Sequence, residues 1–306
     1  GGTFFMSAGN WIQQVTLGWL AYDMTTSAFV VGAVMGTRSV PFLVSGPIGG
    51  VLGDRLDRKK ILIGTQLASI TLALILGILL ATDRAQVWHL FVFALLSGSA
   101  WAFMNPVRMA LVANLVPTED LMNAVALNSA SFNLNRALGP AAAGILLGLF
   151  GPATNFFLQA AMYTGVLTAI LPIRVPKQDC SLITEASLLS NLAAGVKYIA
   201  TQRTIMAMLL FSFIPSLFVM PFTNGIMPVF SEEVLHGGEE GLGFLLSAAG
   251  VGGLTGTLVV ASLGNFRRKG FLLVGGALGG GAAMLFFAQM TSMPLAMLFL
   301  GLVAGS

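Results

Sequence analysis

Long apolar stretches separated by short polar segments make up most of this chain. Each is long enough to cross a hydrocarbon core about 30 Å thick as an α-helix of roughly 20 residues. The apolar runs are continuous, whereas the strands of a membrane β-barrel alternate apolar and polar residues. We therefore predict helical spans at residues 2–22, 28–52, 61–82, 87–112, 122–149, 153–172, 204–230, 241–263 and 270–289, with a tenth that begins near Pro294.

The predicted spans fall into two groups around a more polar stretch. Within that stretch Leu188, Leu192, Val196 and Ile199 follow helical spacing, which predicts an amphipathic surface helix. Two six-helix halves are a known design of membrane transporters. We predict an all-α polytopic membrane protein with a six-helix bundle at 1–172, a cytoplasmic linker at 173–203 and an incomplete second bundle at 204–306. We also expect that the chain is a piece of a longer protein.

Composition and the rarer residues narrow the possible chemistry. Apolar residues make up 56% of the chain and charged residues 9%, which is typical of a membrane protein. The single cysteine, Cys180, cannot form an internal disulfide, and two histidines, His89 and His236, are too few for a metal cluster. The sequence lacks a phosphate-binding loop, a nucleophile elbow and an HExxH run. We therefore expect no cofactor, no metal and no enzymatic activity.

Charge is distributed unevenly between the two sides of the predicted bundle. If the even-numbered loops face the cytoplasm, Arg84 is the one basic residue on the outer side, which also carries the acidic pairs at 232–233 and 239–240. The positive-inside rule then fixes the orientation. We predict a monomer in the inner (plasma) membrane with loop 53–60 and linker 173–203 in the cytoplasm, and no nucleic-acid partner despite the pI of 9.3. The cytoplasmic cations are Arg55, Arg58, Lys59, Lys60, Arg174, Lys177, Lys197, Arg203, Arg267, Arg268 and Lys269.

The loop between the second and third spans carries the most informative motif. The run Gly50-Val51-Leu52-Gly53-Asp54-Arg55-Leu56-Asp57-Arg58-Lys59-Lys60-Ile61-Leu62 resembles the loop signature of the major facilitator superfamily. Asp57 departs from it, because the commonest form has glycine there. The segment from Asn105 to Gly144 resembles the enterobactin-exporter-like, multidrug efflux branch. The resemblance implies a transporter whose gate lies at this loop, with Gly50, Asp54, Arg55 and Arg58 in it and Arg108 bracing it.

The fifth span resembles the antiporter signature of the same superfamily between Arg136 and Gly144, although Ala143 stands in place of one glycine. Gly139 and Pro140 thin this helix and remove a backbone hydrogen bond, so we predict a bend at Gly139, Pro140 and Gly144.

Polar side chains inside the spans suggest a cavity, because an unpaired polar group in hydrocarbon costs several kcal/mol. They lie in stripes on single helix faces, and Arg38 and Arg136 add cations at membrane depth. The alternative is hydrogen bonding between helices of a closed bundle, with the arginines bonded to carbonyls. The predicted cavity residues are Asn10, Gln13, Gln14, Arg38, Trp101, Asn105, Asn128, Arg136 and Asn224.

These patterns predict a secondary exporter of an amphipathic small molecule, either a drug-like compound or a siderophore, with the bilayer and protons as its other partners. Asp23 is the one candidate proton site, although at the end of its span it could simply cap the next helix. A lysophospholipid flippase of the same superfamily remains an alternative. A membrane sensor or scaffold that does not transport is the alternative of another class.

Overall fold

The computed structural model describes residues 2–55, 58–115, 117, 119–172, 201, 202, 206, 225–262 and 269–306. Side chains at 43–55, 58, 105, 106, 109, 110, 112–115, 269 and 271 lie outside this description. The linker at 173–200 and the segments 203–205 and 207–224 also lie outside it, and with them Asn224.

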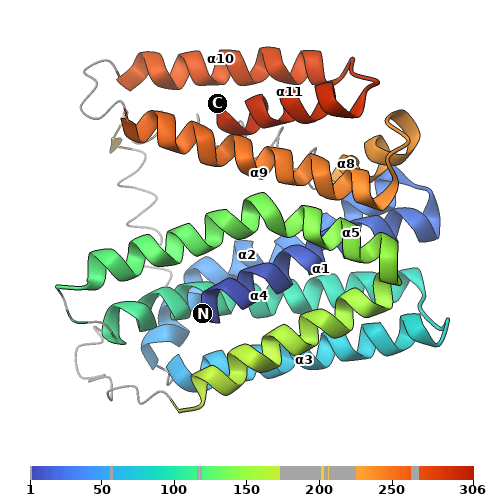
Figure 1. Ribbon diagram of the computed structural model, residues 1–306. Helices are drawn as coiled ribbons and strands as arrows, with labels where there is room; N and C mark the ends of the chain where they lie inside the picture. Colours follow the sequence, from blue (N-terminus) through green and yellow to red (C-terminus); the bar gives the residue numbers. More distant parts are fainter. Residues whose placement is uncertain are drawn as a thin grey trace.

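Long α-helices dominate the described residues, as the apolar pattern predicts (Figure 1). The first group comprises α1 (Gly2–Thr25), α2 (Ala28–Arg55), α3 (Arg58–Ala81), α4 (Val87–Leu115) and α5 (Leu121–Ile170). The second comprises α8 (Met227–Val229), the π-helix η3 (Phe230–Val234), α9 (Gly238–Ser262), α10 (Lys269–Phe287) and α11 (Met293–Gly305). We call the two groups the N-terminal half and the C-terminal half.

Helix α5 contains a sharp break at Gly151, so it forms two of the predicted spans. Gly151 has φ 77° and ψ 171°, a conformation that side chains with a Cβ rarely adopt. Pro152 follows at the first position of the second arm, where its missing N–H costs nothing. Gly151 is the one residue within α5 whose φ and ψ angles are non-helical. The backbone therefore stays helical at Gly139 and Pro140. We call residues 121–150 the first arm and 152–170 the second arm.

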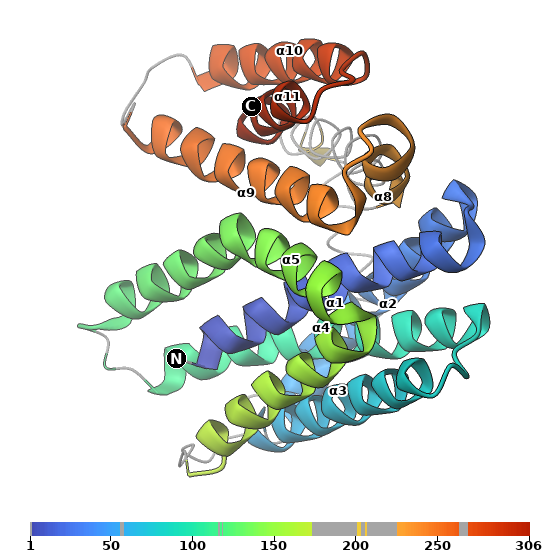
Figure 2. The same ribbon diagram turned by 45° about the vertical axis from the view of Figure 1, so that its right-hand side comes forward.

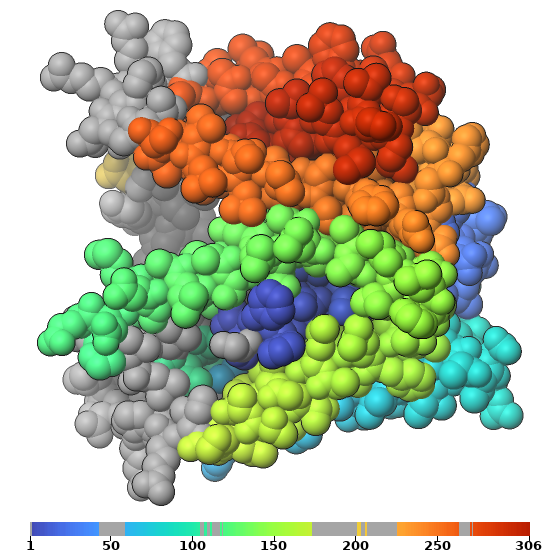
Figure 3. Space-filling view, viewed as in Figure 1, coloured from blue at the N-terminus to red at the C-terminus, as the bar shows by residue number. Residues whose placement is uncertain are grey.

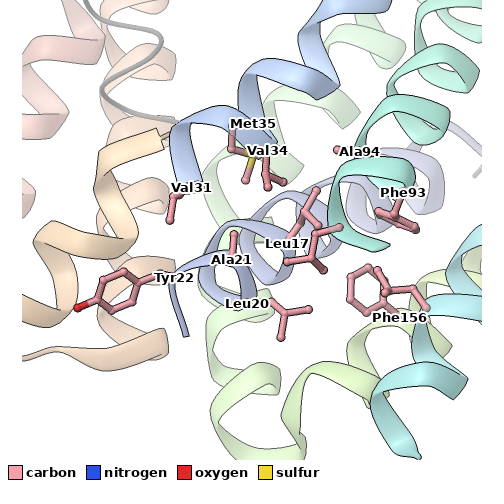
Figure 4. Close-up of a cluster of buried hydrophobic side chains, with 12 residues drawn as sticks. Leu17, Leu20, Ala21, Tyr22, Val31, Val34, Met35, Phe93, Ala94 and Phe156 are labelled. Atoms are coloured by element: carbon pink, nitrogen blue, oxygen red, sulfur yellow. The ribbon is translucent and has the colours of Figure 1, made fainter. Parts of the chain in front are cut away.

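The N-terminal half packs around an apolar cluster formed by α1, α2, α3, α4 and the second arm of α5. Leu17 of α1 lies beside Phe93 of α4 and Phe156 of α5 (Figure 4). The two phenyl rings meet edge to face with centroids 5.2 Å apart, the geometry that aromatic quadrupoles favour. This cluster holds α1 in the middle of the half, with its polar residues facing several helices.

The two halves contact each other mainly through α5 and α9 (Figure 2). A second apolar cluster crosses this boundary, with Val15 of α1 and Ala143 of α5 against Leu242 and Leu245 of α9. The space-filling surface shows the atoms of α9 directly against those of α5 (Figure 3). Toward Leu121 and toward Ser262 both helices are largely exposed, and the two ribbons diverge at that end (Figures 1 and 2).

The outer faces of the helices are apolar and exposed, as a protein surrounded by lipid requires. Among the described residues, four helices are long and apolar enough to cross a membrane: 59–81, 87–104, 121–170 and 238–262. The exposed apolar side chains on them include Ile75, Ile78, Leu138, Leu258 and Val259.

Candidate functional site

Arg38 of α2 joins two polar residues of α1 in the N-terminal half. It donates from Nη2 to Asn10 Oδ1 at 2.5 Å and from Nη1 to Gln14 Oε1 at 3.3 Å. Asn10 and Gln14 are one helical turn apart, which puts both amides on the face of α1 that meets α2. Close approach of the two neighbouring helices α2 and α4 is possible because Gly98 has no Cβ to meet the Arg38 backbone. The structure thus brings together three of the predicted cavity residues, Asn10, Gln14 and Arg38.

Gln13 faces a different set of helices. Its Nε2 donates to Ser97 Oγ of α4 at 2.9 Å, and its Oε1 accepts from Gln159 Nε2 of the second arm at 2.7 Å. All three side chains are buried. Gln13 therefore links three helices inside the N-terminal half, which is the interhelical role left open as the alternative to a cavity.

A small hollow lies between the two halves, next to the Arg38 cluster. Gln14 and Met35 line it from the N-terminal half, and Met227, Pro228 and Leu242 line it from the C-terminal half. Its volume is about 10 Å³, room for about one water molecule and far less than the roughly 300 Å³ at the low end for pockets that bind drug-sized ligands. Methionine side chains are flexible and can repack around differently shaped apolar molecules.

The contact between α5 and α9 depends on small residues and one hydroxyl. Ser247 Oγ accepts from the backbone N–H of Ala141 at 2.8 Å, one residue after Pro140. A Cβ on Gly243 would lie 3.0 Å from Gly144 Cα, and a Cβ on Gly250 would lie 2.8 Å from Ala137 Cα. The guanidinium of Arg136 lies over Gly253. The predicted bend residues and Arg136 thus lie at the boundary between the halves.

A separate contact joins the halves at the end of α1. The Tyr22 hydroxyl donates to Glu233 Oε1 of η3 at 3.0 Å. Asp23, the next residue, is exposed. A proton site inside a transport path needs shielding from bulk water on at least one side, and this exposed position does not provide it in the conformation shown.

The predicted gate loop is described only in part. Gly50, Asp54 and Arg55 lie in the last turns of α2 and Arg58 begins α3, but their side chains lie outside the described residues. Arg108 is described, and its Nη1 donates to Asn128 Oδ1 at 3.1 Å. This contact joins α4 to the first arm of α5.

The remaining predicted cavity residues have different surroundings. Trp101 packs on an apolar cluster that includes Met104 and Tyr163. The side chain of Asn105 lies outside the described residues, as does Asn224. Sequence reasoning overlooked Asn155, which donates to Thr16 Oγ1 at 2.8 Å and to Ala143 O at 3.1 Å. Asn155 and Gln159 lie four residues apart inside an apolar span, and that spacing is the signal that could have found them.

The structure has two helical halves in contact, membrane-length helices and a small hollow between the halves. These features place it in the class of multi-pass membrane proteins with the transporter fold of the major facilitator superfamily. The structure matches that of a bacterial homolog of the human lysosomal transporter Spinster in an inward-facing, unoccupied conformation. The TM-score is 0.73 at 17% identity, over 99% of this chain and 71% of that one. This likeness establishes the fold.

The chain matches the transmembrane secretion effector family over residues 2–306, and it belongs to that family of major facilitator proteins, which are transporters and not enzymes. The staphyloferrin A transporter of Staphylococcus aureus is 27% identical over 263 residues, covering 84% of this chain and 64% of that protein. The multidrug efflux pump Tap of Mycolicibacterium fortuitum is 25% identical over 310 residues, covering 97% and 74%.

The enterobactin exporter EntS of Shigella boydii is 27% identical over 276 residues, covering 87% of this chain and 63% of the exporter. The resemblance to the enterobactin-exporter and multidrug efflux branch is therefore confirmed. The chain spans roughly two thirds of the length of these relatives, with 64% and 63% of the two siderophore transporters covered.

Proposed function

We propose that the protein is a secondary active exporter that moves an amphipathic small molecule across the inner (plasma) membrane by alternating access and proton antiport. The relatives named above include a siderophore transporter, a siderophore exporter and a multidrug efflux pump. The supporting observation in this chain is the hollow between the halves, with Gln14 on one wall and Met227 on the other. A site shared by both halves is what a rocking transporter needs, because each half can then carry one wall away.

The contacts between the halves support the alternating-access part of the proposal. The halves meet along 136–144 of α5 and 239–253 of α9, and again at Tyr22 and Glu233. Beyond these contacts the ends of α5 and α9 at Leu121 and Ser262 are exposed. We infer that these ends are cytoplasmic, because the basic loops lie on this side. The hollow would then be closed toward the outside and open toward the cytoplasm.

Transport by the full-length protein in inside-out vesicles tests the function. An amphipathic fluorescent dye should accumulate when the vesicle lumen is acidified, and a protonophore should abolish the accumulation. Accumulation that is insensitive to the protonophore would contradict proton antiport. Movement of a labelled lysophospholipid between leaflets, with no movement of the dye, would replace the exporter with a flippase. Dye binding without movement would indicate a sensor.

The gate part of the proposal predicts that Asp54→Asn abolishes dye accumulation while expression and membrane insertion stay normal. The substitution keeps every cation of the loop, so the orientation in the bilayer should not change, but it removes the negative charge that a gate can bind and release. Asp57→Asn is the matched control, since Asp57 stands where the superfamily signature commonly has glycine, and it should leave accumulation within about twofold. Normal accumulation with Asp54→Asn would remove Asp54 from the gate.

A further inference from the structure

Arg38 is a membrane-depth cation whose hydrogen-bond partners among the described residues are two neutral amides. We propose that Arg38, together with Asn10, binds an anionic oxygen group of the transported molecule, such as a carboxylate. This inference rests on the proposed export function and adds the chemical class of the substrate. It follows from three observations: where the acidic residues lie, which hydrogen-bond donors remain, and how close the cluster is to the hollow.

On α2, which carries Arg38, and on α1, which carries its two partners, the acidic residues lie far from Arg38. Among the 12 Asp and Glu residues, Asp54 is the one on the same helix as Arg38. It lies 16 positions further along, which corresponds to about 24 Å at 1.5 Å per residue. Asp23 is the one acidic residue of α1, and it lies at the far end, 13 residues beyond Asn10. Among the described residues no ion pair joins Arg38 to a carboxylate on any helix, and its hydrogen bonds go to the neutral amides of Asn10 and Gln14.

The partners that Arg38 does have leave the cluster rich in donors. A guanidinium only donates, so Asn10 and Gln14 must present their oxygens to it, and their NH2 groups point elsewhere. The described residues provide no acceptor for the Asn10 NH2. The Nε of Arg38 is buried and has no hydrogen-bond partner among the described atoms. A site with a fixed positive charge and spare N–H groups fits an anionic acceptor.

Gln14 connects this cluster to the proposed substrate path. Its side chain lines the hollow between the halves and also accepts from Arg38. Arg38 itself is only half-buried, so a ligand group can reach it without the bundle unfolding. The neighbouring walls are apolar, from Val15, Met35 and Leu246. One ligand with an acid group toward Arg38 and an apolar body toward these walls would match both surfaces.

Binding to the purified full-length protein tests the inference separately from transport. The probes are a fluorescent coumarin carboxylic acid and the carboxamide of the same dye, which differ in charge but hardly in shape. The native protein should bind the acid at least tenfold more tightly, since a hydrogen bond to a charged group is commonly worth a factor of about 10 or more. Arg38→Gln should remove this preference by weakening acid binding, while amide binding stays within about twofold. Arg38→Lys should retain part of it.

Arg84→Gln is the control for charge alone, because Arg84 is exposed and lies outside the helices, and it should keep the preference for the acid. Equal binding of the two probes by the native protein would overturn the inference, as would an unchanged preference in Arg38→Gln. A native protein that binds neither probe would overturn it as well. Arg38-dependent acid binding by a protein that accumulates no dye in vesicles would leave the anion site intact and would overturn the export function instead.

Discussion

Replacing Gly250 with alanine should weaken the contact between the two halves. A Cβ at this position would collide with the backbone carbonyl of Arg136 and would lie 2.8 Å from Ala137 Cα on the same facing helix, whereas non-bonded carbon atoms prefer about 3.5–4.0 Å. The obstacle is backbone, which cannot rotate away as a side chain can. The first arm of α5 and α9 would therefore have to move apart by roughly 1 Å, at an overpacking cost of about 1–3 kcal/mol.

A matched control makes this prediction quantitative. Gly279 of α10 is exposed, and a Cβ there would meet nothing within 4 Å. Both substitutions raise helix propensity by the same amount, about 1 kcal/mol in water, so this gain cancels between the two variants. Gly250→Ala should therefore be less stable than Gly279→Ala by about 1–3 kcal/mol.

The assay is reversible unfolding of the full-length protein in mixed detergent micelles, followed by helix content. Crosslinking between cysteines placed on α5 and α9 gives a second measurement, with Cys180 replaced by serine to avoid background. Gly250→Ala should slow the crosslink as well as lower stability. Equal stability of the two alanine variants, with equal crosslinking, would refute the close contact of α5 and α9 at Gly250.

Two further contacts between the halves give separate predictions. Ser247→Ala leaves the N–H of Ala141 without its acceptor at 2.8 Å and should lower the free energy of unfolding by about 1–3 kcal/mol in the same assay. The control Ser99→Ala loses only a hydrogen bond within its own helix, and its loss of stability should be less than half as large. Equal losses would contradict the role of Ser247. Tyr22→Phe removes the hydrogen bond to Glu233. A cysteine placed at position 231 should then react about fivefold faster with a membrane-impermeant maleimide, which corresponds to the loss of ~1 kcal/mol. An unchanged labelling rate would show that this hydrogen bond does not hold the outer end closed.

The helices could be predicted from the sequence because lipid leaves the backbone few options. A continuous apolar run of membrane length must satisfy its own hydrogen bonds, so it forms a helix. The predicted break between residues 149 and 153 corresponds to Gly151, where positive φ requires glycine. The end of the predicted span at 230 was less accurate, because η3 continues to Val234 through Glu232 and Glu233. Charged residues suggest a loop, yet these two extend the helix beyond the apolar run.

The candidate site could be predicted only in outline. Asn10, Gln13 and Gln14 are spaced on one face of α1, which indicated a single stripe. In the structure Gln13 turns to Ser97 and Gln159, while Asn10 and Gln14 turn to Arg38. Adjacent residues on a helix differ by about 100° around the axis, which is enough for Gln13 and Gln14 to meet different neighbours. Spacing gives the angle between side chains, but the position of the neighbouring helices decides which of them share a site.

Glycine pairs at small-xxx-small spacing show the same limit of prediction from spacing alone. Gly32 and Gly36 have the small-xxx-small spacing of a packing face, yet a Cβ on either would meet no atom within 4 Å in the described part of the chain, although a Cβ on Gly225 would lie 3.3 Å from Gly32 Cα. Gly252 and Gly256 have the same spacing, and there Cβ atoms would collide with the backbone of Gly301 and Gly305 on α11. That partner helix also has glycines four residues apart, so the two backbones can approach without side chains between them. The spacing of a glycine pair therefore does not by itself show close packing; the backbone that faces the pair decides it, and between α9 and α11 that facing backbone is itself glycine.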